Sequence, residues 1–459
     1  MNTQIKTGKT ALIMFIIAAA VLSAAQTVVT TGISSITSDF QTTTNIAQLV
    51  YSSFLLVLGV MIPLSAFIAR RFKVKTILIS SLAIFLIGAI LSFISPSIEI
   101  LIISRVIQGI GAGILLPITQ IVLFKVVPEE KWQVYMGLFG LIIGIVPALA
   151  PTLGGAIIDY AGWRPIFLIF AIIIAILILI SMVAVKLEFE TGDYPLDILS
   201  LILCILACSG IMFGFNNITK DVSPYMVIPI IIGVISLFIF VKRQFNIKTP
   251  LVSLIPLKNK FFFAGTLFSS LLYFTMCGLN VIMPLFVQSV SHYTATESGL
   301  ILLPATLVMI VFNFVGAIIA NKIGVRKVLI LSCIFSIVGY LAMTTYTLNT
   351  TMEYMAITQI IRSIGAGLGL MPAVTWTIAI VSGDIEDATA INNTVRQIIG
   401  AIGSAIAVVL MTLFAGGKIT HSLISQEAFA QTSFLMSVLA VISLIIVVLY
   451  IKDEVHDLI

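Results

Sequence analysis

Charged residues are scarce in this chain: Asp, Glu, Lys and Arg make up only 9% of its 459 residues, whereas hydrophobic residues make up 60%. A soluble globular domain carries about 25% charged residues. The composition therefore excludes an ordinary soluble domain and indicates that most of the chain has the lipid bilayer as its solvent.

Cysteine and histidine are also rare, and they are kept apart. Cys204, Cys208, Cys277 and Cys333 fall in apolar runs, whereas the histidines fall in loops or in the C-terminal tail. This separation predicts neither a disulfide nor a metal site. The glycine-rich run 109–113 lacks the Lys-Ser or Lys-Thr pair of a phosphate-binding loop, so we also expect no ATP site, no cofactor and no enzymatic activity.

Long apolar runs, by contrast, are abundant. About fourteen of them have close to the roughly 20 residues that span a hydrocarbon core, which predicts an all-α polytopic membrane protein. The predicted spans are 11–34, 48–69, 76–95, 99–124, 133–158, 164–187, 195–216, 224–243, 261–289, 297–320, 327–347, 353–382, 388–414 and 430–451.

Basic residues cluster in alternate loops between these runs. If the amino terminus is cytoplasmic, most of the 24 Lys and Arg lie on the inner side, as in the clusters 70–75, 242–243 and 322–327. This bias predicts a multi-pass protein of the cell membrane with both termini in the cytoplasm. The net charge of +5 then reflects topology, and we expect no nucleic-acid binding.

Parts of the sequence recur about 250 residues later in the chain. The segment 105–117 is echoed by 362–372, and the segment 66–75 is echoed by 316–327. Parallel halves of this kind are described for major facilitator transporters. The repeat divides the chain into a six-helix bundle, two additional transmembrane helices and a second six-helix bundle, with predicted boundaries 1–187, 188–245 and 246–459.

Four segments occur in an order that resembles the fourteen-span drug:proton antiporter family of the major facilitator superfamily: 105–109, 144–155, 163–167 and 393–403. The resemblance covers nearly the whole chain. It implies a major facilitator fold of two six-helix bundles with two extra central helices. It also implies export of small amphipathic compounds by alternating access, with protons as the coupling ion.

Two departures from the family pattern concern charge. Ala25 stands where the first span of the family holds an acidic residue, and Arg70 stands where the turn after the second span holds an Asp. The first departure leaves the identity of the proton carrier open. The second concerns the contacts that gate the pathway.

Small residues recur at every fourth position of the run 133–158, at Gly140, Gly144 and Ala148. Such a face allows a neighbouring helix to approach closely, and the prolines that follow favour a kink. The resemblance implies that this segment seals the pathway in one state, and the alternative is ordinary helix packing. The predicted gating residues are Gly140, Gly144, Pro147, Pro151, Gly154 and Gly155.

The charged residues in the interior of the apolar runs are the arginines Arg105, Arg362 and Arg396. A charge at the bilayer centre costs about 2.5 to 3.5 kcal/mol even on a lenient scale, so such residues line a pathway or join helices. The resemblance implies that Arg105 takes part in proton transfer, and the alternative is a structural arginine bonded to carbonyl groups of facing helices. The carboxylates predicted to act with Arg105 lie at the outer ends of spans and are Asp159, Glu297 and Glu353. The alternative for each is a role in ordering a helix end.

Polar side chains recur at helical spacing in the runs 11–34 and 261–289, with weaker additions elsewhere. A polar face is poorly placed toward lipid, so we expect it to line an interior cavity, the alternative being hydrogen bonds between helices. The predicted cavity residues are Gln26, Thr30, Tyr273, Asn280, Asn313, Gln359, Arg362 and Arg396.

The sequence therefore predicts a monomeric secondary transporter that exports amphipathic drugs or toxic compounds, most simply in exchange for protons. One alternative is a dedicated transporter of a single metabolite or lipid. Another is a transporter-like membrane sensor.

Overall fold

The computed structural model describes residues 2–42, 44–189, 191–193, 195–216, 224–247, 249–291, 293, 295–381, 384–414 and 425–453. Within these ranges every regular element is a helix, which confirms the prediction of an all-α polytopic protein. Long apolar segments fold in this way because the bilayer core offers backbone groups no hydrogen-bond partner, whereas a helix satisfies them within one segment.

The helices follow one another in three groups. The first half of the chain contains α1 (Asn2–Thr27), η1 (Val28–Gly32), α2 (Ile33–Asp39), α3 (Thr44–Met61), α4 (Leu64–Arg71), α5 (Val74–Phe93), α6 (Ile98–Val126), η2 (Glu129–Lys131), α7 (Trp132–Ala161) and α8 (Arg164–Ala184). The middle contains α9 (Ile198–Asn216), α10 (Pro224–Asn246) and η3 (Ile255–Lys258). The second half contains α11 (Lys260–Ser289), α12 (Ala295–Ile323), α13 (Val325–Met343), α14 (Met352–Ala379), α15 (Ile385–Phe414) and α16 (Gln426–Tyr450).

Twelve of the described helices are long and apolar enough to cross a membrane, and α3 with α4 forms one further span that is bent by 58°. Pro63 lies at the bend, where it has no amide proton for the helix ladder. The remaining candidate, α9, is shorter, with an apolar part at Ile198–Gly214. Each predicted apolar run thus corresponds to one helix or to the bent pair.

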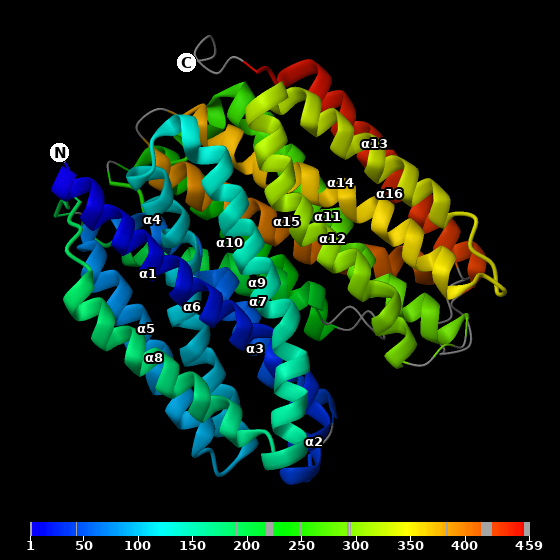
Figure 1. Cartoon of the computed structure of the whole chain (residues 1–459), viewed down its shortest axis with the longest axis horizontal. Coiled ribbons are helices and arrows are strands. Elements are labelled where there is room, and N and C mark those ends of the chain that lie inside the picture. The colour runs from blue at the N-terminus through cyan, green and yellow to red at the C-terminus, as the bar shows by residue number, and fades with distance from the viewer. Residues whose placement is uncertain are drawn as a thin grey trace.

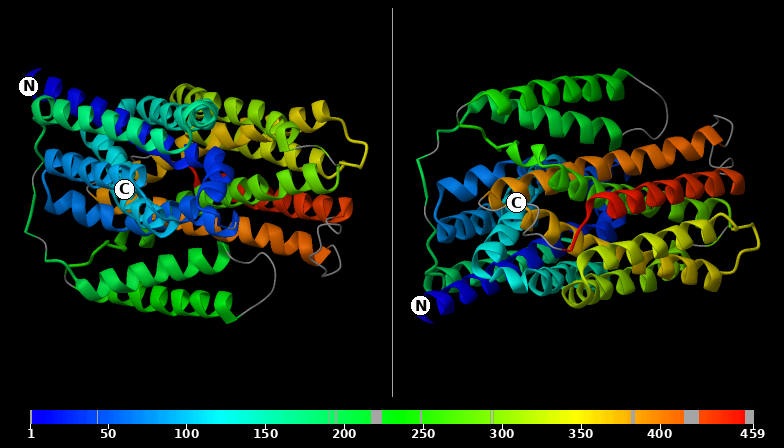
Figure 2. Two further views of the ribbon diagram at one scale, coloured as in Figure 1. Left: turned by 90° about the horizontal axis from the view of Figure 1, so that it is seen from below. Right: turned by 90° about the horizontal axis from the view of Figure 1, so that it is seen from above.

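Two groups of helices lie side by side. Helices α1 to α8 pack on one another, as do α11 to α16, and α7 joins the two groups through α12 and α14 (Figure 1). We call these groups the N bundle and the C bundle. The pair α9 and α10 stands apart from both in the views from below and from above (Figure 2), although α9 also touches α3 and α15.

Glycines explain how α9 and α10 pack so closely. A Cβ atom on Gly210 would lie 2.5 Å from the carbonyl oxygen of Pro229, and one on Gly233 would lie 2.7 Å from the amide nitrogen of Ile211. The pair is also joined at one end, where Arg243 donates to Asp197 from Nε at 2.8 Å and from Nη2 at 2.9 Å. These hydrogen bonds lower the pKa of Asp197 to about 2, so its carboxylate is ionised at neutral pH.

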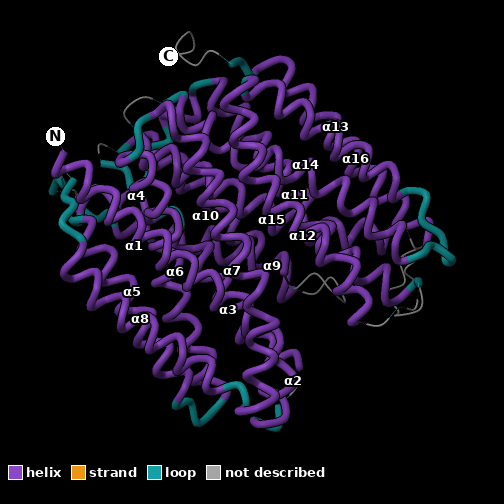
Figure 3. The backbone as a smooth tube through the Cα atoms, in the orientation of Figure 1, coloured by secondary structure: helices purple, strands orange, loops and turns teal. Residues whose placement is uncertain are grey.

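Both described ends of the chain lie on the same side of the bundles. Near its start α1 meets the end of α6, since a Cβ atom on Gly8 would lie 3.1 Å from Val126. After α16, the carbonyl of Lys452 accepts a hydrogen bond from Trp376 Nε1 at the end of α14, at 2.8 Å. We call this the terminal side, and Figure 3 shows loops gathered there and at the far ends of the helices, which we call the opposite side.

Candidate functional site

An ion pair joins the two bundles at the terminal side. Arg70 at the end of α4 donates from Nη1 to Asp387 in the first turn of α15, and from Nη2 to the carbonyl of Leu251 at 3.2 Å. The other oxygen of Asp387 accepts from the backbone amide of Ser253 at 3.0 Å. Asp387 is 2% exposed. The N bundle, the C bundle and the loop before η3 therefore meet at one buried carboxylate.

A second set of polar contacts lies beside the first. Lys125 at the end of α6 forms an ion pair with Glu386 of α15. About two helical turns further along α15, Asn393 Nδ2 donates to Gln120 Oε1 at 2.8 Å, and Arg396 Nη2 donates to Asn393 Oδ1 at 2.7 Å. Two sets of polar contacts thus join α6 and α15, and the inner set includes Arg396.

Helix α7 contacts the C bundle through its first half. A Cβ atom on Gly140 would lie 2.8 Å from Met371 of α14, and one on Gly144 would lie 2.7 Å from Ile310 of α12. The predicted smooth face of the helix is therefore the one that faces the other bundle, and the close approach requires glycine at these positions.

The second half of α7 turns to its own bundle. Thr27 Oγ1 of α1 donates to the carbonyl of Pro147 at 2.8 Å, and Gly154 lies against Val28 of η1. Gly155 has no atom near its would-be Cβ, and the side chain of Pro151 lies outside the described part of the chain. Gly140 and Gly144 of α7 thus face the C bundle, whereas Pro147 and Gly154, further along the helix, contact α1 and η1 of the N bundle.

A cluster of aromatic and cationic side chains lies between the bundles. The Arg396 guanidinium of α15 stands 5.5 Å from the ring centre of Tyr273 in α11. Tyr51 of α3 lies within electrostatic range of Arg105, Tyr273 and Cys277. Tyr273 and Arg396, two of the residues predicted to line a cavity, therefore lie close together within the C bundle. Tyr51 was not predicted, although Gln48 lies three residues before it, at a spacing that places both on one face of a helix.

Arg105 is fully buried inside the N bundle. Its Nε donates to the carbonyl of Val50 at 3.0 Å, Nη2 to the carbonyl of Ala25 at 3.1 Å, and Nη1 to Gln108 Oε1 at 2.6 Å. The guanidinium also lies 4.3 Å from the ring centre of Phe54. One of these acceptors is the backbone carbonyl of Ala25, the position where the resembling family has an acidic residue.

Arg362, the repeat counterpart of Arg105, has fewer partners. It is 5% exposed, and Nη2 donates to Ser363 Oγ at 2.8 Å, but Nε and Nη1 have no hydrogen-bond partner among the described residues. Gln359 and Asn313 are buried too, and their side-chain oxygens also have no hydrogen-bond partner among the described residues. These three residues supply unsatisfied polar atoms within the C bundle, where a ligand or water can complete them.

The remaining predicted residues lie on exposed or half-buried positions. Asp159 and Glu353 are exposed and Glu297 is half-buried, and none of them is among the described partners of Arg105. Thr30 and Asn280 are exposed. Gln26 is half-buried.

A carboxylate that was not among the predicted site residues has a clear structural role. Asp39, at the end of α2, pairs with Arg164 and accepts a hydrogen bond from Trp163 Nε1 at 3.1 Å. It therefore ties the opposite-side ends of α2 and α8. Among the described residues, no group of three or more His, Cys, Asp and Glu has the arrangement of a metal site.

Comparison with known proteins identifies the class to which this arrangement belongs. The sequence profile of the Major Facilitator Superfamily matches residues 15–404, and a second match covers 262–458. The chain is a member of this superfamily. It is therefore a transporter-type membrane protein and not an enzyme.

Three bacterial relatives show how the similarity is spread. The uncharacterized MFS-type transporter YcnB of Bacillus subtilis is 31% identical over 390 residues, which are 84% of this chain and 83% of the relative. The lincomycin resistance protein LmrB of the same species is 27% identical over 84% of this chain and 82% of its own length. The multidrug export protein EmrB of Haemophilus influenzae is 27% identical over 83% of this chain and 76% of its own length.

Proposed function

We propose that this transporter exports small amphipathic compounds by alternating access, in exchange for protons. The observation that carries the proposal is the distribution of contacts between the bundles. Ion pairs of Arg70 and Lys125, and the hydrogen bond that Gln120 accepts from Asn393, join the bundles at the terminal side. Further along α7, the contacts of Pro147 and Gly154 are with the N bundle. Bundles held together at one end form one of the two states that alternating access requires.

The orientation follows from the basic loops. The bias in Lys and Arg supports a cytoplasmic terminal side in the cell membrane, so the closed end faces the cytoplasm and the structure corresponds to an outward-facing state. The same proposal includes a monomeric state. It also includes the division of the chain into a first bundle (1–187), two additional helices (188–245) and a second bundle (246–459).

The substrate class is supported by the cluster between the bundles and by the relatives. Tyr51, Tyr273 and Arg396 combine aromatic surface with one cation, which suits an amphipathic molecule that carries a ring and a polar or anionic group. Two relatives carry names that refer to lincomycin resistance and to multidrug export. The predicted residues Gln26, Thr30, Asn280, Asn313, Gln359 and Arg362 extend this cavity in the proposal.

Proton coupling is the finer part of the proposal. The buried Arg105 lies next to Tyr51 at the edge of the cluster, and the proposed proton carriers are Asp159, Glu297 and Glu353, which come near the pathway as the bundles move. We assign the small residues and prolines of α7 to the gate, because they determine how closely this helix packs and where it can bend. These residues are Gly140, Gly144, Pro147, Pro151, Gly154 and Gly155.

One experiment tests export and coupling together. Purified protein in proteoliposomes receives a pH gradient, and the movement of a fluorescent amphipathic dye and of protons is recorded at once. We expect the dye to move against its gradient while protons move the opposite way. Dye transport that does not depend on the pH gradient would contradict proton coupling. If none of a panel of amphiphiles is transported, export is contradicted.

A further inference from the structure

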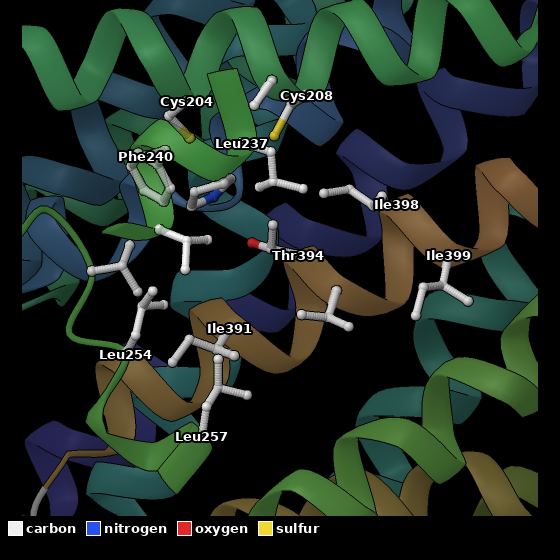
Figure 4. A pocket seen from close by; sticks show the side chains of 15 residues that line it. Cys204, Cys208, Leu237, Phe240, Leu254, Leu257, Ile391, Thr394, Ile398 and Ile399 are labelled. Atoms are coloured by element: carbon white, nitrogen blue, oxygen red, sulfur yellow. The ribbon is translucent and has the colours of Figure 1, made fainter. Parts of the chain in front are cut away.

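An apolar cavity of about 300 Å³ lies where α9 and α10 meet the two bundles. Cys204 and Cys208 of α9 and Phe240 of α10 form one side of it, and Ile391 and Ile398 of α15 form the other (Figure 4). Leu254 and Leu257, from the segment around η3, close the end nearest the terminal side. Pro63, at the bend between α3 and α4, brings the N bundle to the same wall.

The chemistry of the lining excludes a polar ligand. Apart from the two thiols, the lining side chains are aliphatic or aromatic except for Thr394, whose hydroxyl donates to the carbonyl of Ala390 in its own helix at 2.7 Å. No unsatisfied polar atom of the lining is available to hold water. An apolar cavity of about 150 Å³ stays dry and binds a molecule such as benzene, so a cavity twice as large is suited to a longer hydrocarbon.

The surroundings indicate which hydrocarbon reaches the cavity. Behind the lining, α9 and α10 expose large apolar side chains such as Leu206 at 41% and Phe238 at 70%, as expected of helices that face lipid. Acyl chains of the bilayer are therefore the hydrocarbons in direct contact with this part of the molecule.

A cation stands at the terminal-side end of the cavity. Lys258 follows the lining residue Leu257, and its Nζ lies 5.5 Å from the ring centre of Phe245. Phe245 is four residues after the lining residue Val241, so it continues the same face of α10. None of the ion pairs within the described residues involves Lys258. A basic residue in this position matches the phosphate of a lipid headgroup.

We propose that this cavity binds one acyl chain of an anionic phospholipid whose phosphate pairs with Lys258. The walls come from both bundles, and the loop that closes the cavity is the one whose Leu251 and Ser253 are bonded to Arg70 and Asp387. The bound lipid therefore stabilises the state in which the terminal side is closed. The site requires only that the chain lies in a membrane, and it does not depend on export.

Photocrosslinking tests the site on the full chain. The protein is placed in nanodiscs that contain phosphatidylglycerol with a diazirine on the acyl chain, and crosslinked peptides are mapped by mass spectrometry. We expect crosslinks on the cavity side of α9 and on α15 around Val395. Equal labelling of all lipid-facing positions of α9 and α10, with none on α15, would overturn the proposal.

Matched variants separate the cavity from the general lipid shell. Ala207→Phe places a ring in the cavity, whereas Leu206→Phe places the same ring on the exposed face of the same helix. We expect about a tenfold loss of crosslinks to α15 for Ala207→Phe and none for Leu206→Phe. Val395→Phe fills the cavity from the other wall and replaces Ala207→Phe if that variant does not fold. Undiminished crosslinking in a folded, cavity-filled variant contradicts the assignment.

The headgroup is tested by comparing phosphatidylglycerol with phosphatidylcholine. Lys258→Gln is expected to remove the preference for phosphatidylglycerol. The control variant Lys242→Gln should keep this preference, because Lys242 lies on the face of α10 beside Leu199 and Ile239. Equal crosslinking of the two lipids in the unmodified protein would refute the pairing with Lys258. A photoreactive drug that reacts at the cavity while the lipids do not would identify a substrate site instead and overturn the proposal.

Discussion

Arg70 and Asp387 form an ion pair between the N bundle and the C bundle, although 317 residues separate them in the sequence. The resembling family has an Asp at the position of Arg70, so the sign of the charge is reversed here. The structure shows that the reversed charge meets a carboxylate in the opposite bundle.

Breaking this ion pair is expected to open the terminal side. Removing one partner of a buried ion pair costs about 3 to 5 kcal/mol, and 1.4 kcal/mol corresponds to about a factor of ten in an equilibrium. Asp387→Asn and Arg70→Gln should therefore each shift the population toward the state open at the terminal side. The shift can be measured as the distance between spin labels on the terminal-side ends of α6 and α15.

The neighbouring residue supplies a control for this experiment. Arg71 lies 3.7 Å from Asp193, whose side chain is 97% exposed, and an exposed pair of this kind contributes little. Arg71→Gln should leave the spin-label distance unchanged, and the exchanged pair Arg70→Asp with Asp387→Arg should restore part of the closed population. If Asp387→Asn keeps the original distance distribution, the ion pair does not hold the terminal side closed.

The glycine face of α7 gives a second prediction. Gly144→Leu should abolish export and leave the protein inserted and folded, because a side chain there would meet Ile310 and keep the bundles apart. Gly299→Leu, in α12, is the matched control, since nothing lies within 4 Å of its would-be Cβ. Drug efflux from cells and size-exclusion profiles check both variants, and normal efflux with Gly144→Leu would refute the role of this face.

The topology is testable with single cysteines in a cysteine-free background. Tyr160, at the opposite-side end of α7, is 94% exposed, and the side chain of Glu188, beyond the terminal-side end of α8, is 69% exposed. In intact cells an impermeant maleimide should label Tyr160→Cys but label Glu188→Cys only after permeabilisation. The reverse pattern would invert the proposed orientation.

The charge of the substrate is a fourth prediction. Arg396 and Arg105 lie at the cluster between the bundles, and no carboxylate is among the described contacts of Tyr273 or Arg396. A compact permanent dication would lack a countercharge there, so neutral, zwitterionic and anionic amphiphiles should be exported in preference. Resistance assays with expressing cells compare the classes. Strong resistance to dications with none to anionic amphiphiles would reverse the inference.

The helices could be predicted from the sequence, and several contacts between them could not. Apolar runs of membrane-spanning length are a local signal, so even the short α9 was placed. The pairing of Arg70 with Asp387 depends on how two bundles dock, which no local pattern records. The glycine face of α7 could be predicted, because small residues recur in the sequence at helical spacing. Its partner Ile310 could not, because it is one of many isoleucines.

The buried arginines show the same division. Their position inside apolar runs marked Arg105 and Arg396 as unusual, because a charge in the bilayer must find partners. The partners themselves are mostly backbone carbonyls, side-chain amides and aromatic rings. The sequence allowed either carboxylates or carbonyl groups of facing helices as partners for Arg105. Carbonyl groups occur at every residue, so it gave no reason to select Val50 or Ala25.

Arg105 provides the last prediction, which separates proton coupling from structure. Arg105→Ala leaves two carbonyls and Gln108 without their donor in a buried site, and each hydrogen bond to a charged group contributes about 1.5 to 3 kcal/mol. Arg105→Lys keeps the charge but cannot direct donors to three acceptors in different directions. We expect both variants to lose proton-driven export, with a smaller fall in unfolding temperature for Arg105→Lys.

The decisive measurement is the dependence of transport on the pH gradient in proteoliposomes, together with thermal unfolding. A purely structural arginine would lower the unfolding temperature and leave the remaining transport coupled to protons. An arginine that takes part in coupling would leave drug movement that no longer responds to the gradient. Neutralising Asp159, Glu297 and Glu353 one at a time should then reproduce that uncoupling at one of the three positions. If Arg105→Ala exports at the normal rate and still depends on the pH gradient, the coupling scheme is wrong.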